Sequence, residues 1–136
     1  MFVFYRPDIG YVKESMIYLG SMLVRNLREY EAFSCFINLL HSYHFLSFFR
    51  GDIREIEWRV RFFDELLLGI NPIIYHHFKA LELSSECFLM HWFLSLFTNC
   101  FQNESFVARL WDNFLLEGEL FAFKIGLAII VNLFFL

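Results

Sequence analysis

The sequence predicts an all-α protein, a multi-helix array of about seven helices, and three observations lead to this prediction. Apolar residues recur at spacings of three and four residues along almost the whole chain. No run of alternating apolar and polar residues, bounded by turn residues, competes with that pattern. The chain has 136 residues, of which 58% are hydrophobic and 19% charged, so it can bury a core. We therefore expect a single helical domain, or a piece of one, over residues 1–136.

The first two helices are expected from Tyr11 to about Arg25 and over a segment that contains Tyr30 and Leu40. In the second segment, Glu29 and Glu31 lie where the positive end of a helix dipole favours negative charge. The apolar positions of this segment, at helical spacing, are Tyr30, Phe33, Ile37 and Leu40.

The third helix has the clearest amphipathic pattern. Glu55 precedes Arg59, and Glu57 precedes Arg61, by four residues, which places each pair on one helix face. Together with Arg54, these arginines are expected to lie on a solvated face rather than to form a binding patch. The apolar positions of this helix are Ile53, Ile56, Val60, Phe63 and Leu67.

Four more helices are expected after the third, and capping residues indicate where they begin. Their expected ranges are Ile73 to about Leu81, a segment through Trp92 to about Thr98, Glu104 to about Leu116, and the tail from Leu120. The expected N-caps are Asn71, which precedes Pro72, then Ser84 or Ser85, and Asn103, whereas Gly69 and Gly118 are expected to end helices. The Phe-rich stretches 92–101 and 114–123 are expected to lie in the core.

Charge and cysteine content exclude several classes. The chain has 11 Lys and Arg against 15 Asp and Glu, so it lacks the basic face that nucleic acid requires. Its 3 cysteines, Cys35, Cys87 and Cys100, are odd in number and widely spaced, which does not indicate a disulfide framework. A reducing, cytoplasmic compartment is therefore expected.

The apolar tail from Leu120 to Leu136 raises the question of a membrane span. Lys124 and Asn132 interrupt this stretch, and a spanning helix needs about 20 consecutive apolar residues. The start of the chain does not resemble a signal peptide, because Arg6 and Asp8 follow a short apolar run. We expect no span, and peripheral contact with a membrane remains one alternative.

Two pairs of residues could suggest a metal site. His41 and His44, like Cys87 and His91, fall on one helical face, but neither pair occurs in a Cys-x-x-Cys or His-Glu-x-x-His context. The chain also has no Gly-x-Ser-x-Gly motif and no glycine-rich phosphate loop. No metal, cofactor or catalytic nucleophile is expected.

Several blocks of the sequence resemble the TBC domain of Rab GTPase-activating proteins. The first two blocks are Arg6-Pro-Asp-Ile-Gly-Tyr-Val-Lys-Glu-Ser-Met and Glu31-Ala-Phe-Ser-Cys-Phe-Ile-Asn-Leu-Leu. The later blocks are Phe63-Asp-Glu-Leu-Leu with Pro72, Tyr75, His77 and Phe78, then Trp92-Phe-Leu-Ser-Leu-Phe-Thr, and Arg109-Leu-Trp-Asp-Asn-Phe-Leu-Leu-Glu-Gly. The last block is the most specific, and the resemblance extends from Arg6 to about Ile130.

The resemblance implies an orthogonal helical array, similar to the later two thirds of a TBC domain, that binds a Rab-type small GTPase and regulates vesicle trafficking. Family members insert an arginine, from an Ile-x-x-Asp-x-x-Arg motif, and a glutamine, from a Tyr-x-Gln-Gly motif, into the active site of the GTPase. Only ten residues precede Tyr11, so the arginine segment is expected to be missing. Trp92, Arg109, Trp111 and Asp112 are expected to have structural roles in packing and capping.

The glutamine motif has changed in this chain. It reads Tyr11-Val12-Lys13-Glu14, so that Lys13 stands at the glutamine position and Glu14 at the glycine position. Lysine has three donors and no acceptor, whereas glutamine has both, so Lys13 cannot orient an attacking water. We expect Tyr11, Glu14 and Arg6 to contact the GTPase, without efficient catalysis.

Two other interpretations remain open from the sequence. The chain could be a competent GTPase activator as part of a longer protein, or with a partner that supplies the arginine. It could instead be a membrane-associated helical protein. If helices that would cover the first helix are absent, we expect self-association or binding of a helical partner through Met16, Ile17, Leu19, Met22 and Leu23.

Overall fold

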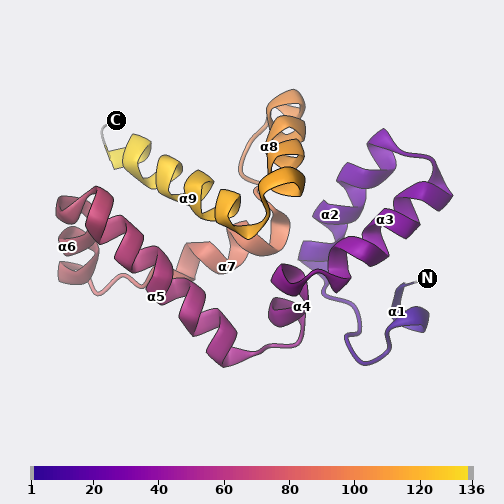
Figure 1. Ribbon diagram of the computed structural model, residues 1–136, viewed down its shortest axis with the longest axis horizontal. Coiled ribbons are helices and arrows are strands. Elements are labelled where there is room, and N and C mark those ends of the chain that lie inside the picture. Colours follow the sequence, from indigo (N-terminus) through magenta and orange to yellow (C-terminus); the bar gives the residue numbers. More distant parts are fainter. Residues whose placement is uncertain (1, 135–136) are drawn as a thin grey trace.

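The computed structural model describes residues 2–134, except for the side chains of Glu14 and Tyr43. This range contains nine α-helices and no strand (Figure 1). The helices are α1 (Phe2–Tyr5), α2 (Lys13–Asn26), α3 (Glu29–His41), α4 (Tyr43–Phe49), α5 (Ile53–Ile70), α6 (Pro72–Ala80), α7 (Glu86–Ser95), α8 (Glu104–Glu117) and α9 (Glu119–Phe134). The all-α prediction is confirmed.

Seven of these helices correspond to the expected segments, and α1 and α4 are additional. The second expected segment corresponds to α3, and Ser42, whose backbone is extended with φ of -61° and ψ of 149°, separates α3 from the additional α4. The chain therefore turns between α3 and α4 at Ser42, which has no glycine or proline next to it in the sequence. The sequence gives no strong stop signal at this position.

The end of α7 also differs from the expectation, because the helix stops at Ser95 rather than near Thr98. Leu96 and Phe97 adopt left-handed backbone conformations, with φ of 47° and 58°. Both side chains are buried. Burial of two large apolar side chains offsets a conformation that non-glycine residues rarely adopt.

The expected N-cap positions are occupied as predicted, by Asn71 for α6, Ser85 for α7 and Asn103 for α8, but Ser85 makes no side-chain capping bond. The side-chain oxygen of Asn71 accepts a hydrogen bond from the Ile74 backbone N–H at 3.2 Å, and that of Asn103 accepts from Phe106 at 3.1 Å. At the third site, the Ser84 hydroxyl accepts from the Glu86 N–H at 3.3 Å. The Ser85 hydroxyl instead donates to Asp64 Oδ1 at 2.5 Å and links α7 to α5.

The two glycines expected to end helices behave differently. Gly118 ends α8 with a positive φ of 75°, as expected. Helix α5 continues past Gly69 and ends at Ile70, one residue before the Asn71 cap of α6.

The α2–α3 hairpin lies at one end of the molecule and the α5–α6 pair at the other (Figure 1). Helix α7 lies between them and packs against both α2 and α9. Phenylalanine side chains fill the core, as expected for the Phe-rich stretches. Phe93 packs against Phe123 with ring centroids 5.0 Å apart, and both side chains are buried.

Part of the expected bare face on α2 lies in this core. The side chains of Met16 and Leu19 are 3% and 0% exposed, so these two residues cannot mediate self-association. Their helix packs against α3 and α7 of the same chain, which was not foreseen from the sequence. Of the five residues, Ile17 is exposed, and Met22 and Leu23 are partly buried.

Helix α9 contains most of the apolar tail, and residues 135–136 of that tail lie outside the described range. Within residues 2–134, no helix has the length and apolar character needed to cross a membrane.

Candidate functional site

Lys13 is the first residue of α2, and its side chain is exposed. Tyr11, two residues earlier, is 57% exposed, and the intervening Val12 has no side-chain capping bond to α2. The backbone of Glu14 belongs to the first turn of α2, but its side chain lies outside the described part of the structure. A cation in this turn faces the positive end of the helix dipole, so Lys13 does not stabilise α2 electrostatically.

The beginning of α2 faces α7 across a pocket of about 380 Å³. Lys13 and Tyr18 line it from α2, and His91 and Ser95 line it from α7. A polar network supports the α7 side. The Ser95 hydroxyl donates to Asn99 Oδ1 at 2.6 Å, and the Asn99 amide donates to His91 Nε2. The donors of this network are bound within the protein, so the exposed Lys13 ammonium group is the donor in this pocket that suits a polar or anionic ligand.

Arg6 lies at a different place from Lys13, beside the end of α3. Its guanidinium donates to both Asp8 carboxylate oxygens, at 2.7 and 2.6 Å, and contacts His41 Nε2 at 2.6 Å. The hydrogen bond from Arg6 lowers the pKa of Asp8 to about 2. Arg6 is bound by these contacts and is not among the residues that line the pocket beside Lys13.

The two tryptophans of the family blocks have packing roles. Trp111 is 4% exposed, and its Nε1 donates to Thr98 Oγ1 at 3.1 Å. Trp92 packs against Phe88 with ring centroids 4.8 Å apart. Arg109 and Asp112 are exposed on α8. Asp112 lies in the middle of this helix, so the expectation that it caps a helix end is wrong.

The histidine and cysteine pairs do not converge. His41 contacts Arg6, and His44, on the next helix, contacts Glu119. Cys87 and His91 both line the α2–α7 pocket. No group of three or more His, Cys, Asp and Glu side chains in the described range could hold a metal ion.

Sequence reasoning missed a buried ionic cluster and placed one of its members, Arg59, on a solvated face. Arg59 is only 1% exposed, and its Nε donates to Glu119 Oε1 at 2.5 Å. The expected pair with Glu55 is also present, at 3.1 Å. The same Glu119 oxygen, Oε1, also accepts from His44 Nδ1 at 2.8 Å. The partners are 60 and 75 residues apart in the sequence, so no local pattern could reveal them.

The charge of Glu119 is maintained by its partners. Burial alone would raise the pKa of this carboxyl group, but hydrogen bonds from His44 and Arg59 lower the pKa below its usual value. The carboxylate therefore remains ionised at neutral pH and holds α4, α5 and α9 together.

Comparison with known proteins identifies the class to which this fold belongs. The sequence model of the Rab-GTPase-TBC domain matches residues 1–134. The chain therefore belongs to the Rab-GTPase-TBC domain family, as the sequence blocks indicated.

Its relatives are much longer proteins. Drainin of Dictyostelium discoideum is 33% identical over 129 residues, which are 95% of this chain and 29% of Drainin. TBC1 domain family member 12 of Xenopus tropicalis is 35% identical over 130 residues, 93% of this chain and 18% of the relative. TBC1 domain family member 14 of Homo sapiens is 32% identical over 126 residues, which are 93% of this chain and 18% of the relative. The chain thus spans less than a third of each relative, and no solved structure matches it.

Proposed function

We propose that this chain binds a Rab-type small GTPase in its GTP-bound state and regulates it without accelerating GTP hydrolysis. Family membership supports the choice of partner. The observation that carries the proposal is the position of Lys13, exposed in the first turn of α2 where the family resemblance places a glutamine. The chain is then a regulator of a GTPase rather than an enzyme itself.

The chemistry of Lys13 explains how the chain can bind the GTPase without accelerating GTP hydrolysis. A glutamine amide can accept a hydrogen bond from the attacking water while its N–H donates to the phosphate or backbone. The Lys13 ammonium group can only donate, so it attracts phosphate oxygens and leaves the water without an acceptor. The first turn of α2 adds backbone N–H donors of the same polarity.

The arginine contribution is also missing from these 136 residues, which contain no Ile-x-x-Asp-x-x-Arg sequence. An arginine supplied in trans accelerates hydrolysis by about 10³–10⁵, or about 4–7 kcal/mol of transition-state stabilisation. Arg6 is the arginine nearest in sequence to Lys13, and its guanidinium is already bound to Asp8 and His41. Arg6 would have to break these bonds to act in catalysis.

We propose that Tyr11, Lys13, Glu14 and Arg6 contribute to the GTPase-binding face. Tyr11 is exposed beside Lys13 and offers an aromatic ring and a hydroxyl group. Glu14 replaces a glycine with a side chain and a negative charge, which opposes close approach of phosphate groups. Binding is therefore expected to be weaker than for a chain with glycine at this position.

The length of the relatives supports a second candidate function. Because this chain spans only 18–29% of their lengths, other segments or a partner could supply the arginine. The chain would then be the later part of a competent GTPase activator. Addition of a separate polypeptide that carries the arginine motif should restore hydrolysis under this second candidate and should leave it basal under the first.

A Rab partner also implies a cellular setting. We propose a cytoplasmic location, peripheral to endomembranes, with a role in vesicle trafficking. Self-association remains part of the proposal, now through exposed residues such as Ile17, Leu115 and Leu116. Sedimentation at micromolar concentration tests it, and a monodisperse monomer would contradict it.

Binding is tested by titration of the full chain against Rab proteins loaded with a non-hydrolysable GTP analogue or with GDP. We expect at least one Rab to bind, with higher affinity for the GTP-analogue form. Lys13→Glu should weaken this complex, since it reverses the charge that faces the phosphates. Lys124→Glu, which reverses an exposed charge on α9, is the matched control and should not change the affinity. Absence of binding to every Rab would overturn the proposal.

A further inference from the structure

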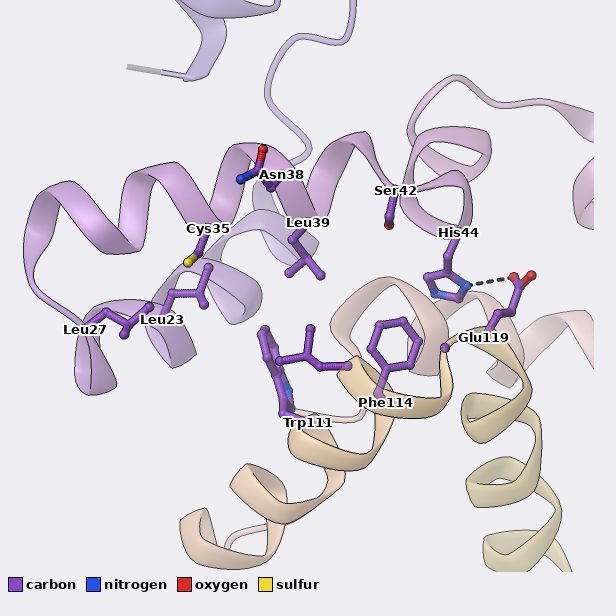
Figure 2. Close-up of a pocket in the computed structure, with 12 residues that line it drawn as sticks. Leu23, Leu27, Cys35, Asn38, Leu39, Ser42, His44, Trp111, Phe114 and Glu119 are labelled. Carbon is purple, nitrogen blue, oxygen red and sulfur yellow. Dashed lines mark hydrogen bonds and ion pairs between the residues drawn. The ribbon is translucent and has the colours of Figure 1, made fainter.

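A second pocket lies between the α2–α3 hairpin and α8, and Lys13 does not line it. Its volume is about 610 Å³, within the range of about 300–1,000 Å³ typical of small-molecule sites. Leu23 and Leu39 face Trp111 and Phe114 across it (Figure 2). Most of its wall is therefore apolar.

Polar groups gather at one end of this pocket. Ser42, His44 and Glu119 lie close together there (Figure 2). The Glu119 carboxylate is hydrogen-bonded to His44 and to Arg59. The Ser42 hydroxyl is different, because its oxygen is buried and has no hydrogen-bond partner within the described part of the chain. Buried polar atoms of folded proteins are rarely unpaired, so this hydroxyl is a candidate for pairing with a ligand.

An ion pair lies at one end of the pocket. The His44–Glu119 pair lies at the Ser42 end. Outside the lining of the pocket, Arg25 at the end of α2 pairs with Glu104 at the beginning of α8 and connects the two helices. A docked helix needs an open-ended groove that accepts several successive turns. A pocket of about 610 Å³ with polar groups at one end has the size of a small-molecule site instead.

The charges at the polar end select against ionic ligands. Glu119 is an ionised carboxylate whose partners are already within the protein, so an anionic head group would be repelled and desolvated there. A cationic head group would have to compete with the buried Arg59 and His44. An uncharged oxygen can accept from the Ser42 hydroxyl at much lower cost.

We propose that this pocket binds an uncharged lipid-like molecule, with its hydrocarbon chain along Leu23, Leu39 and Trp111 and an oxygen at Ser42. The class includes long-chain alcohols and other neutral lipids with one small polar group. This inference is independent of any GTPase, because none of the residues that define the pocket belongs to the Lys13 region.

The cysteines of the chain provide a direct test. Cys35 is exposed and lines this pocket, whereas Cys87 is exposed and lines the separate α2–α7 pocket. Burial raises the pKa of the Cys100 thiol to about 11, so that it reacts slowly with alkylating reagents. The rate of alkylation of each cysteine by iodoacetamide is measured by peptide mass spectrometry, with and without decan-1-ol below its aggregation limit. We expect decan-1-ol to slow alkylation of Cys35 at least fivefold and to leave Cys87 unchanged.

Two variants separate recognition of the oxygen from general apolar binding. Ser42→Ala should weaken protection of Cys35 by decan-1-ol about fivefold to tenfold, as loss of one hydrogen bond implies, and should not change protection by decane. Leu39→Trp fills the pocket and should abolish protection by both, while circular dichroism checks that helix content is retained. Decanoate should protect more weakly than decan-1-ol, because it carries a charge.

Three results would overturn the inference. One is no protection of Cys35 by decan-1-ol. Another is equal protection of Cys35 and Cys87, which indicates non-specific adsorption. The third is equal protection by decane and decan-1-ol with no effect of Ser42→Ala, which shows that the pocket does not recognise an oxygen.

Discussion

Arg59 of α5 and Glu119 of α9 form an ion pair inside the protein, with Arg59 Nε 2.5 Å from Glu119 Oε1. His44 contacts the same oxygen through Nδ1, and its Nε2 lies 3.3 Å from the Phe93 carbonyl oxygen. Nδ1 donates to the Glu119 carboxylate, and the Phe93 carbonyl oxygen lies beside the other ring nitrogen, so both edges of the buried imidazole face oxygen atoms. The cluster connects α4, α5, α7 and α9 and fixes the centre of the molecule.

Glu119→Gln is expected to destabilise the protein strongly. The substitution preserves the shape of the side chain but leaves the buried Arg59 guanidinium and the His44 ring without their carboxylate. Removal of one partner from a buried ion pair costs about 3–5 kcal/mol of unfolding free energy. Urea denaturation measures the difference.

Glu117→Gln is the matched control, because it makes the same chemical change two residues away. Glu117 pairs with Lys124 on the surface, and exposed ion pairs contribute only about 0–1 kcal/mol. Equal losses in the two variants would contradict the structural role of the cluster.

Stability should also decline at acid pH through Glu119. The folded pKa of this carboxyl group lies below its unfolded value, which is about 4.3, so the group binds protons more weakly in the folded state. Its contribution is therefore complete above about pH 5 and is lost as the pH falls through the folded pKa. Urea denaturation between pH 7 and pH 3 should show a smaller decline for Glu119→Gln than for the parent chain. An equal decline of the unfolding free energy with pH in the two proteins would show that Glu119 is not the source of the acid sensitivity.

Gly126 allows α9 to approach the core closely. A Cβ atom at this position would lie 3.1 Å from Phe63 Cε2 and 3.7 Å from Trp92 Cε3, and Phe63 is fully buried. We expect Gly126→Ala to lose roughly 1 kcal/mol, because overpacking exceeds the gain in helix propensity. In Gly69→Ala the new methyl group meets nothing within 4 Å, so this variant should gain about 0.5–1 kcal/mol. Similar thermal-melting shifts in both variants would contradict the close packing.

The sequence predicted most of the fold because the relevant signals are local. The Asn71 cap before Pro72 and the Gly118 stop at the end of α8 are each determined within a few residues, and both are confirmed. The separate helix α4 after Ser42 and the left-handed residues Leu96 and Phe97 were not predicted. Leu96 and Phe97 are buried, so tertiary burial outweighs local preference at these two residues.

For the functional residues too, only features within a short stretch of sequence could be predicted. The changed motif at Lys13 is visible in the sequence, because it is a substitution within a short family pattern. Arg59 carries the same local pattern as the exposed Arg61, four residues after a glutamate. Only the approach of Glu119, 60 residues later, distinguishes the buried arginine from the exposed one.

Lys13 and Glu14 are expected to affect binding more than chemistry. The double variant Lys13→Gln and Glu14→Gly restores the family motif and removes a negative charge near the phosphates, so it should strengthen the complex with a GTP-loaded Rab. Hydrolysis should stay near basal, because no arginine is supplied. Isothermal titration measures the affinity, and an unchanged value would show that this surface does not contact the GTPase.

The most direct test of the account is single-turnover GTP hydrolysis by a Rab that the chain binds, at chain concentrations that saturate the complex. With Lys13 at the glutamine position and no arginine motif in these residues, the rate should rise by no more than about tenfold over the basal rate. A rise of about a thousandfold with this chain alone would contradict the account, and would require Arg6 or another arginine to leave its present partners and enter the GTPase active site.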